Sequence, residues 1–522
     1  MTATSDRIVV IGAGMGGLAA AARLAHAGCD VTVVEAQGYP GGKMRTVDSP
    51  AGPVDAGPTV MTMRHVFDAL FADCGARLED AVTLHQEPLL ARHFWPDGAT
   101  LDLYDDVDRS AEAVHGLAGA RAEAEFRSFS TRAARLFDAF EAPMMLSPTP
   151  RIGGLTAHVM KHPGLIPVMA PFSSLASVLK RQFTDPRLRQ LFGRYATYVG
   201  GSPFSSPAVL ALIWSAEERG VWRVEGGMHR LARAMAALAE GQGARFRFGA
   251  RAVRVERQSG AVRAVHLEGG ERIGCDRVVF NGDPRALAAG LLGDGLRGAV
   301  ADTGVNPRSL SARVWTFAAT PQGPDLAHHN VFFGADPQAE FGPIARGRAP
   351  EDPTLYVCAQ DRGMGLVPPD LERFEIIENA PPLPHASAEE TETCRTRTFQ
   401  ALARFGLRFS PAPPDGALTT PQGFETLFPA SLGSLYGRSP SGMRAPFQRP
   451  TARTAVPGLY LAGGGAHPGA GVPMATLSGR HAAEAILTDL ASTSTSRATA
   501  TPGGMSTASA MTAAARSRSS PS

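Results

Sequence analysis

Several features that would place a chain in a common structural class are scarce or missing in this 522-residue sequence. The five cysteines are scattered and form no C-x-x-C pair, so neither a disulfide framework nor a zinc site is indicated, and a reducing cytosolic compartment is expected. No uninterrupted apolar run reaches the about 20 residues needed to span a bilayer. The first residues lack the basic and apolar stretches of a secretory signal, so export is not expected.

Net charge and aromatic content are also low. With 51 Lys and Arg against 49 Asp and Glu, the formal charge is +2, so no nucleic-acid partner is predicted. Charged residues make up 19%, hydrophobic residues 44% and aromatic residues 7%, and the many Gly and Pro are typical of a loop-rich globular enzyme. Residues 492–522 have no aromatic residue and no apolar periodicity to offset their ordering entropy, so we predict a disordered tail.

A glycine-rich stretch, RIVVIGAGMGG, begins at Arg7 and predicts a βαβ unit. A buried strand at 8–11 leads through a tight turn into a helix at about 16–27, and a second buried strand follows at 31–35. Strong apolar character in both strands is typical of a parallel sheet that is covered on both faces.

The turn of this unit carries a nucleotide-binding pattern. Gly12, Gly14 and Gly17 form G-x-G-x-x-G with Ala13 inside it, and Glu35 ends the second strand. These glycines allow a tight turn, close approach of the backbone to a pyrophosphate and close helix packing, while the carboxylate is placed to accept from ribose hydroxyls. We therefore predict a dinucleotide site; a plain βαβ turn is the alternative.

A second glycine-rich stretch, GLYLAGGGAHPGAGVPMATLSGR, lies near the other end of the chain at Gly458–Arg480. It predicts a short strand joined by glycines to an amphipathic helix that begins near Met474. Between the two stretches, residues 245–283 alternate in the manner of antiparallel strands and close on a buried strand at 277–280. Residues 106–240 are more helical.

The segment after Glu35, AQGYPGGKMRT, identifies the cofactor class by resemblance. Its Gly42, Lys43 and Arg45 resemble the second phosphate-side motif of the FAD-containing amine oxidase and carotenoid desaturase superfamily. DAGPTV follows as in bacterial phytoene desaturases. Further matches lie at about 190–285 and 455–485, and the resemblance implies FAD rather than NAD.

The closing motif, GGGAHPGAGVPMATLSG, is most similar to that of the 1-hydroxycarotenoid 3,4-desaturases of purple bacteria. The resemblance places Gly463 and Gly464 near the flavin ribitol. It also places Val472, Pro473 and Met474 at the start of a helix that points at the flavin ring, where a helix N-terminus stabilises an anionic reduced flavin. At Gly464 amine oxidases commonly carry an acidic residue, so a side-chain contact with the ribitol is in doubt.

Val253 is the predicted adenine contact, because the strand ARAVRVERQ resembles the one that clasps the adenine; an ordinary sheet strand fits the pattern equally well. The expected fold is α/β, with a Rossmann-like FAD-binding domain and an interleaved substrate domain of mixed sheet and helices. The FAD-binding parts are expected at 1–105, 241–290 and 451–491, and the substrate parts at 106–240 and 291–450, with the first of these helical and membrane-facing.

The resemblance implies an FAD-dependent oxidoreductase that introduces a C3–C4 double bond into acyclic 1-hydroxycarotenoids such as 1-hydroxyneurosporene, in bacterial spheroidene or spirilloxanthin biosynthesis. A phytoene-type desaturase and a carotenoid isomerase are the nearest alternatives. A flavin amine oxidase is a third, although it would need an aromatic cage, and the closing loop has no Trp or Tyr. A non-catalytic FAD-binding protein, similar to Rab escort proteins, is a fourth.

No catalytic acid or base stands out, and the catalytic residues stay unassigned. His467 in the closing motif and Asp55 are candidates, but a hydrogen-bonding structural histidine and a turn or helix-cap aspartate are the competing interpretations. Hydride loss from C4 would leave a cation spread along the polyene, so a weak base or water could take the C3 proton.

A carotenoid is dissolved in the membrane, so contact with a bilayer is expected. Residues 151–183 mix apolar stretches with Lys161, Lys180 and Arg181, as a monotopic segment does; a core helix pair interrupted by prolines is the alternative. The expected location is the cytoplasmic side of the bacterial inner or photosynthetic membrane, with oxygen or a quinone as electron acceptor.

Overall fold

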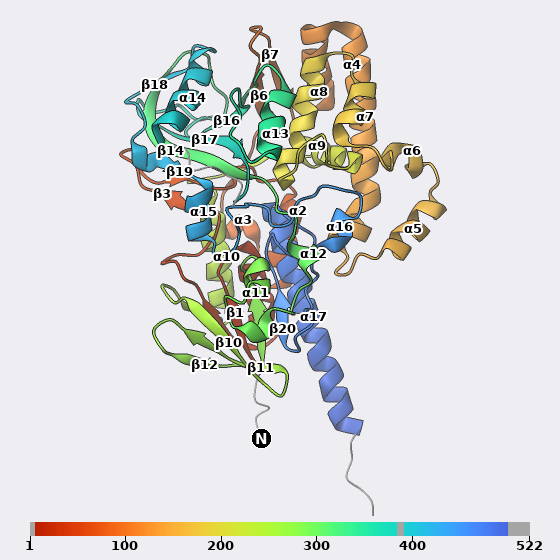
Figure 1. Cartoon of the computed structure of the whole chain (residues 1–522), viewed down its shortest axis with the longest axis vertical. Coiled ribbons are helices and arrows are strands. Elements are labelled where there is room, and N and C mark those ends of the chain that lie inside the picture. Colours follow the sequence, from red (N-terminus) through yellow and green to blue (C-terminus); the bar gives the residue numbers. More distant parts are fainter. Residues whose placement is uncertain (1–5, 384–390, 500–522) are drawn as a thin grey trace, which may run out of the picture.

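Two large sheets, a smaller three-stranded sheet and a block of helices form most of the part of the chain that the computed structural model describes, residues 6–383 and 391–499 (Figure 1). The first sheet is parallel and has the strand order β20-β13-β1-β2-β9. Its strands are β1 (Arg7–Ile11), β2 (Asp30–Val34), β9 (Arg245–Arg247), β13 (Arg277–Phe280) and β20 (Leu459–Leu461). Three separate parts of the chain thus supply one sheet, which confirms the α/β class and the interleaved arrangement predicted from the sequence.

Different structures cover the two faces of this sheet. Helices α1 (Met15–His26), α10 (His229–Gly241) and α17 (Val472–Thr499) pack on one face in a core rich in Ala and Leu. On the other face lies an antiparallel sheet of β10 (Ala252–Gln258), β11 (Ala261–Leu267) and β12 (Arg272–Gly274). Because α10 packs against α1, its residues lie with the nucleotide-type sheet and not in the helical part that was predicted to extend to residue 240.

Glycines allow α1 and α17 to cross closely. A Cβ atom at Gly16 would lie 2.4 Å from the Gly463 nitrogen and 2.9 Å from the Ala475 oxygen, and one at Gly479 would lie 2.2 Å from the Gly16 oxygen. Any larger residue at Gly16 would force these backbones apart. The first and last parts of the described chain therefore meet at this crossing.

The second sheet has eight strands, in the order β18-β14-β17-β16-β15-β6-β7 with β19 beside β14. Its strands are β6 (Leu89–Phe94), β7 (Thr100–Tyr104), β14 (Ser311–Gln322), β15 (His329–Phe332), β16 (Leu355–Ala359), β17 (Glu372–Ala380), β18 (Arg408–Ser410) and β19 (Leu418–Thr419). The sequence assigned residues 1–105 to the FAD-binding part, but β6 and β7 join this substrate-side sheet because β6 pairs with β15.

An aromatic core holds the helical block together. Phe126 and Phe129 of α4 (Val107–Phe140) pack against Phe192, whose ring also contacts Phe183 and Trp214. The block consists of α4 to α9 and lies beside the second sheet (Figure 1). The members after α4 are α5 (Ile152–Lys161), α6 (Leu165–Met169), α7 (Leu175–Gln182), α8 (Pro186–Gly193) and α9 (Leu212–Glu218).

Shorter elements connect these units. The strands are β3 (Thr46–Val47), β4 (Val54–Asp55), β5 (Leu84–Gln86) and β8 (Trp222–Val224). The helices are α2 (Arg64–Asp73), α3 (Leu78–Ala81), α11 (Arg285–Ala288), α12 (Asp302–Val305), α13 (Pro337–Ala345), α14 (Thr391–Ala403), α15 (Pro421–Leu427) and α16 (Ala445–Gln448). Short stretches of π- or 3-10 helix are η1 (Glu141–Leu146), η2 (Arg194–Val199), η3 (Ala208–Ala211), η4 (Asp294–Leu296) and η5 (Asp415–Ala417).

The C-terminal helix corrects one prediction from the sequence. Disorder was predicted from residue 492, but α17 continues to Thr499 as a helix. The rest of the predicted tail, 500–522, lies outside the described residues. None of the five cysteines, all of which lie in the described residues, forms a disulfide bond.

Candidate active site

A cavity of about 980 Å³ passes from the nucleotide-type sheet to the helical block. Its wall includes residues of the β1–α1 turn, the start of α17, strands β16 and β17, and the segments around α4, α6 and η2. The volume is at the upper end of the range for ligand pockets. One cavity therefore contacts both glycine-rich segments and both sheets.

The nucleotide end of the cavity is built from backbone. Gly12 has a φ of +99° that favours glycine, and its oxygen accepts a hydrogen bond of 3.2 Å from the Asn281 side chain. A Cβ atom at Gly14 would lie 2.7 Å from Asn281 Nδ2. Helix α1 begins directly after Gly14 without a side-chain cap, so its first amide groups are directed at the cavity.

Glu35 lies at this end with its carboxylate already oriented. It accepts hydrogen bonds from the amides of Ala13 at 2.7 Å and Gln37 at 2.8 Å, and burial raises its pKa. Glu35 lines the cavity. Ala13 does not line it, but the Ala13 amide orients the Glu35 carboxylate. Gly17 also lies outside the wall and packs against the turn, since a Cβ atom there would be 2.1 Å from the Gly12 oxygen.

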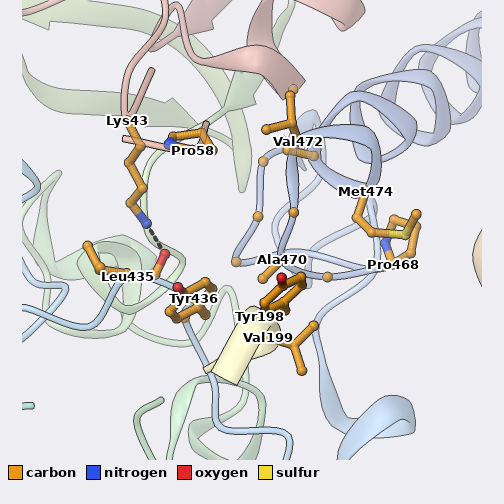
Figure 2. A pocket seen from close by; sticks show the side chains of 18 of the residues that line it. Lys43, Pro58, Tyr198, Val199, Leu435, Tyr436, Pro468, Ala470, Val472 and Met474 are labelled. Atoms are coloured by element: carbon orange, nitrogen blue, oxygen red, sulfur yellow. Dashed lines mark hydrogen bonds between the residues drawn. The ribbon is translucent and has the colours of Figure 1, made fainter. Parts of the chain in front are cut away.

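The second phosphate-side motif packs directly on the first. The Gly41 amide donates to the Ala13 oxygen at 2.9 Å, and a Cβ atom at Gly42 would lie 3.1 Å from the Gly14 Cα. Lys43 extends across the cavity and donates to the Leu435 oxygen at 2.5 Å (Figure 2). Burial lowers the pKa of Lys43 to about 8. Its amine thus faces the substrate side and not the α1 N-terminus.

Arg45 was expected to lie on the phosphate side of the cofactor site, but the structure places it elsewhere. Its guanidinium donates to Thr419 Oγ1 at 2.9 Å, and burial lowers its pKa. Arg45 is not among the residues that line the cavity, because the chain turns away after Met44. The structure thus directs this charge toward the second sheet.

The closing motif returns to the same cavity. Gly463 has a φ of +100°, its amide donates to Ser478 Oγ at 2.6 Å, and a Cβ atom there would lie 2.7 Å from Asn281 Oδ1. Gly463 and Gly464 line the cavity, as do the first residues of α17, which are Val472, Pro473 and Met474. A second helix N-terminus therefore points at the same space.

Exposed apolar side chains mark the outer part of the nucleotide end. Val253 on β10 is 39% exposed and Leu291 is 49% exposed, and both line the cavity. A flat aromatic ring would cover them. Together with Glu35 and the glycine cradle, which no Cβ could enter, these residues fit FAD: amides suit its pyrophosphate, a carboxylate suits its ribose and apolar side chains suit its adenine.

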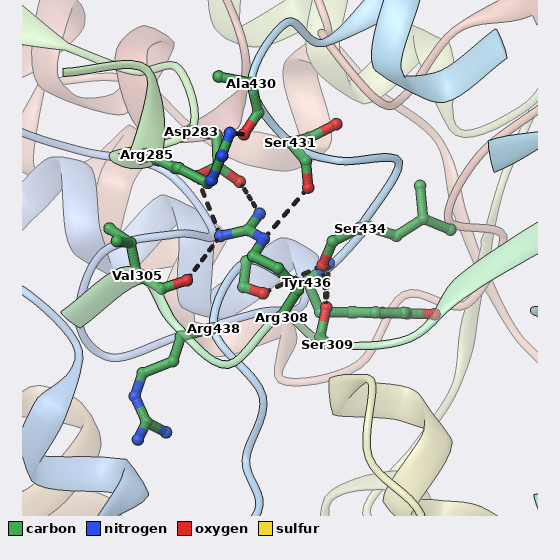
Figure 3. Close-up of polar contacts among 12 residues, drawn as sticks. Asp283, Arg285, Val305, Arg308, Ser309, Ala430, Ser431, Ser434, Tyr436 and Arg438 are labelled. Atoms are coloured by element: carbon green, nitrogen blue, oxygen red, sulfur yellow. Dashed lines mark hydrogen bonds and ion pairs between the residues drawn. The ribbon is translucent and has the colours of Figure 1, made fainter. Parts of the chain in front are cut away.

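A buried ion pair holds the loop that carries Leu435 and Tyr436 against the cavity. Arg308 pairs with Asp283, which follows β13, and donates to the Ser431 oxygen at 3.1 Å (Figure 3). Arg285 adds a hydrogen bond of 3.2 Å to the Ala430 oxygen. These contacts join the nucleotide-type sheet to the loop at 430–438.

Both candidate acid–base residues have structural partners. His467 lines the cavity, but its Nε2 bonds the Ser147 oxygen at 2.8 Å, its ring stacks on His481, and burial lowers its pKa to about 4. Asp55 is not in the wall. It accepts from the Met228 amide at 2.6 Å and from His229 at 2.8 Å, so it caps α10.

Sequence reasoning missed a group of polar residues at the substrate end of the cavity. They are Arg194, Tyr198, Glu217, Tyr356 and Glu375. Glu375 is fully buried, neither carboxylate oxygen has a well-formed hydrogen bond, and burial with the nearby Asp55 charge raises its pKa well above the ordinary value. Arg194 and Tyr198 fall in the region at about 190–285 that matches the family, but nothing in one sequence shows which side chains face a cavity.

One cluster of possible metal ligands lies apart from this site. His328, His329 and Cys358 have ligand atoms within 4.8 Å of one another. His328 already bonds the Arg362 oxygen and His329 the Tyr356 hydroxyl, and none of the three lines the cavity.

Known proteins similar to this chain agree with the geometry. The family model described as flavin containing amine oxidoreductase matches residues 15–307 and 429–487. The hydroxyneurosporene desaturase of Cereibacter sphaeroides is 58% identical, over 94% of this chain and 99% of that protein. Those of Rhodobacter capsulatus and Rubrivivax gelatinosus are 55% and 46% identical, over 92% and 97% of this chain and 98% of each relative.

Solved structures share the fold at low sequence identity. A putrescine oxidase triple mutant superposes with a TM-score of 0.58 at 15% identity, covering 93% of this chain and 99% of the other. Cyclohexylamine oxidase from Brevibacterium oxydans gives a TM-score of 0.56 at 17% identity, covering 93% of this chain and all of the other.

Proposed function

The chain belongs to the flavin containing amine oxidoreductase family and, within it, to the carotenoid desaturases, and we propose that it introduces the C3–C4 double bond into acyclic 1-hydroxycarotenoids of the 1-hydroxyneurosporene type. One observation carries this proposal: relatives 46–58% identical over nearly their whole length are named hydroxyneurosporene desaturase. The chain is an oxidoreductase, and FAD is its cofactor.

The residues at the nucleotide end would hold this cofactor. Bound FAD supplies a ring that accepts a hydride from carbon. The α1 N-terminus would bind the pyrophosphate and Glu35 the ribose hydroxyls, while Gly463 and the start of α17 would orient the ring.

The other end of the cavity suits a long apolar substrate. Phe137, Phe140, Met144 and Met145 line it beside α4 and η1. These side chains exclude water, which favours alignment over the ring as the main source of rate enhancement. Removal of a hydride from C4 leaves a positive charge shared by the polyene, so the C3 proton can pass to water or to a weak acceptor without a strong base.

The test is conversion of lipid-dispersed 1-hydroxyneurosporene by the purified protein with FAD. The expected result is a red shift of the carotenoid absorption, because one more double bond joins the polyene. Phytoene serves as the comparison substrate. Conversion of phytoene with no shift of the hydroxylated carotenoid would replace this function with a phytoene-type desaturase.

We also propose that residues 151–183 contact a bilayer at the cytoplasmic side of the bacterial inner or photosynthetic membrane. Helix α5 has no buried residue, and Ile152, Met160 and Phe172 are 55%, 72% and 88% exposed. Phe172 also lines the cavity, so an exposed apolar surface adjoins a route for substrate. None of the helices in the described part of the chain is long and apolar enough to span a bilayer.

Flotation with anionic liposomes tests this contact. Met160→Gln with Phe172→Ser should reduce the bound fraction several-fold, because apolar burial and nearby Lys161, Lys180 and Arg181 drive interfacial binding. Met364→Gln with Val367→Ser, at 61% and 91% exposed residues elsewhere, is the matched control. If both variants float equally, residues 151–183 do not form the membrane contact. A membrane location fits a quinone as the electron acceptor, and oxygen is the alternative. Turnover without oxygen in the presence of a quinone would distinguish the two acceptors.

A further inference from the structure

A hydrogen-bonded cluster of four residues stands at the substrate end of the cavity. Arg194, Tyr195 and Tyr198 come from η2, and Glu217 comes from α9. Arg194 donates to the Tyr198 hydroxyl at 3.1 Å, and that hydroxyl donates to Glu217 Oε1 at 2.9 Å. The Tyr195 hydroxyl donates to the other carboxylate oxygen. We call these four residues the arginine–tyrosine cluster.

The cluster has free donors that face the cavity. Within the described part of the chain, the Arg194 guanidinium makes a single hydrogen bond, to Tyr198, although it carries five N–H groups. It lies over the rings of Tyr198 and Tyr356, at 5.1 and 5.4 Å from their centroids. None of its nitrogens is both buried and unpaired, and Arg194, Tyr198 and Glu217 all line the cavity. Unused N–H groups are therefore open to a ligand.

Stability alone gives no reason for this arrangement. Burial of a carboxylate and a guanidinium beside an apolar tunnel is expensive, and apolar residues of the same size often serve the fold as well. Much of the neighbouring wall is apolar and includes Leu212, Ile213 and Ala216 on the same helix as Glu217. A polar group held in such a wall fits a ligand that is apolar along its length and polar at one point.

We propose that the arginine–tyrosine cluster binds the tertiary hydroxyl of the substrate and thereby selects hydroxylated carotenoids; this inference rests on the proposed function. The Arg194 guanidinium donates to the hydroxyl oxygen. The hydroxyl proton is accepted by the lone pairs that remain on the Tyr198 oxygen or on the Glu217 carboxylate. An alcohol is both donor and acceptor, and the cluster presents both functions side by side.

The position of the cluster agrees with the position of the reaction. The hydroxyl is on C1, and C1 is only three bonds from C4, so the hydroxyl-binding site must be near the place where C3 and C4 react. Tyr198 shares one part of the cavity with Ala470, Val472 and Met474 (Figure 2). The family resemblance places Val472 and Met474 at the start of the helix that points at the flavin ring. Hydroxyl binding at the cluster would therefore hold C3–C4 at the ring.

Two variants separate recognition from folding. Tyr198→Phe removes one hydroxyl and keeps the ring. The double variant Arg194→Met with Glu217→Gln removes both charges together, so that neither remains buried and uncompensated. Tyr104→Phe removes a hydroxyl outside the cavity wall and is the matched control. Bound FAD per protein and far-UV circular dichroism confirm that each variant is folded.

The measurement is the anaerobic rate of flavin reduction by 1-hydroxyneurosporene and by the parent carotenoid that lacks the hydroxyl. We expect the wild type to prefer the hydroxylated substrate by about 100-fold, and each cluster variant to lower this ratio by about 10-fold or more, because an analogue without the hydroxyl leaves buried polar groups unpaired. Tyr104→Phe should keep the wild-type ratio.

The outcomes separate this inference from the proposed function. A cluster variant that slows both substrates equally, or leaves the ratio unchanged, overturns hydroxyl recognition while the function stands. If the wild type reduces no flavin with the hydroxylated carotenoid, the proposed function itself fails. A lower ratio with retained turnover of the parent carotenoid supports the cluster as the selecting element.

Discussion

At the nucleotide end of the cavity the cradle for the pyrophosphate is formed by backbone amides and glycine Cα atoms, whereas at the substrate end the groups that face the ligand are side chains. Gly12, Gly14 and Gly463 surround Asn281 so closely that a Cβ atom at any of them would approach it to 3.4 Å or less. The substrate end instead combines Arg194 and Glu217 with Phe and Met side chains from separate elements. One end is thus fixed by the path of the chain, and the other can vary with single substitutions.

This difference has a consequence for mutation. Substitutions of the glycines at the nucleotide end move backbone and should affect cofactor binding and stability together. Substitutions at the substrate end change one contact and should affect the choice of substrate with little loss of stability. The following changes test that contrast, beginning with the largest expected effect.

Arg308→Met breaks the buried pair with Asp283 that connects the two ends. The remaining carboxylate would be buried without its charge partner, so the free energy of unfolding should fall by about 3–5 kcal/mol. Urea unfolding monitored by circular dichroism measures this. Arg308→Met with Asp283→Asn should recover part of the loss, and a double variant no more stable than the single one would show that the pair does not couple the ends.

Gly16→Ala tests the crossing of α1 and α17. A Cβ atom would lie 2.4 Å from the Gly463 nitrogen, so the helices must separate, and we expect a loss of about 1–3 kcal/mol in stability together with weaker FAD binding. Gly116→Ala in α4 is the control, because no atom lies within 4 Å of its added Cβ. Isothermal titration with FAD gives the affinity; normal affinity in Gly16→Ala would argue against a rigid backbone cradle.

Lys43 lies between the ends, and its pKa of about 8 predicts a pH effect in the apoprotein. In the folded state the lysine releases its proton at a lower pH than in the unfolded state, where the ordinary value is about 10.4. The unfolded state binds more protons between pH 8 and 10, so stability should rise with pH there, by on the order of 1–2 kcal/mol relative to Lys43→Met. The measurement is the urea unfolding midpoint of both proteins at several pH values. If the two midpoints change with pH in the same way, the lowered pKa of Lys43 is refuted.

Val253→Ala is the smallest change. Removing two methyl groups from a partly exposed contact should weaken FAD binding by about 2- to 3-fold. Val367→Ala, at a 91% exposed residue outside the cavity, is the matched control. An equal affinity in both variants would remove Val253 from the adenine site.

The same contrast explains what could be predicted from sequence. Both glycine-rich segments were recognisable because backbone geometry requires glycine at fixed spacing, and the parallel strands because they are apolar throughout. The positions of β6 and β7 could not be predicted, because the pairing of β6 with β15 joins residues more than 200 positions apart. Arg194 and Glu217 could not be identified either, because a polar residue has no periodic signal that shows which cavity it faces.

The most direct measurement is anaerobic titration of the FAD-loaded protein with 1-hydroxyneurosporene, in which flavin and carotenoid spectra are recorded together. Desaturation requires one flavin to be reduced for each double bond formed, so bleaching and the red shift should proceed in a ratio of about one to one. A carotenoid change without bleaching would indicate isomerisation. Oxidised flavin with an unchanged carotenoid would contradict desaturation of this substrate.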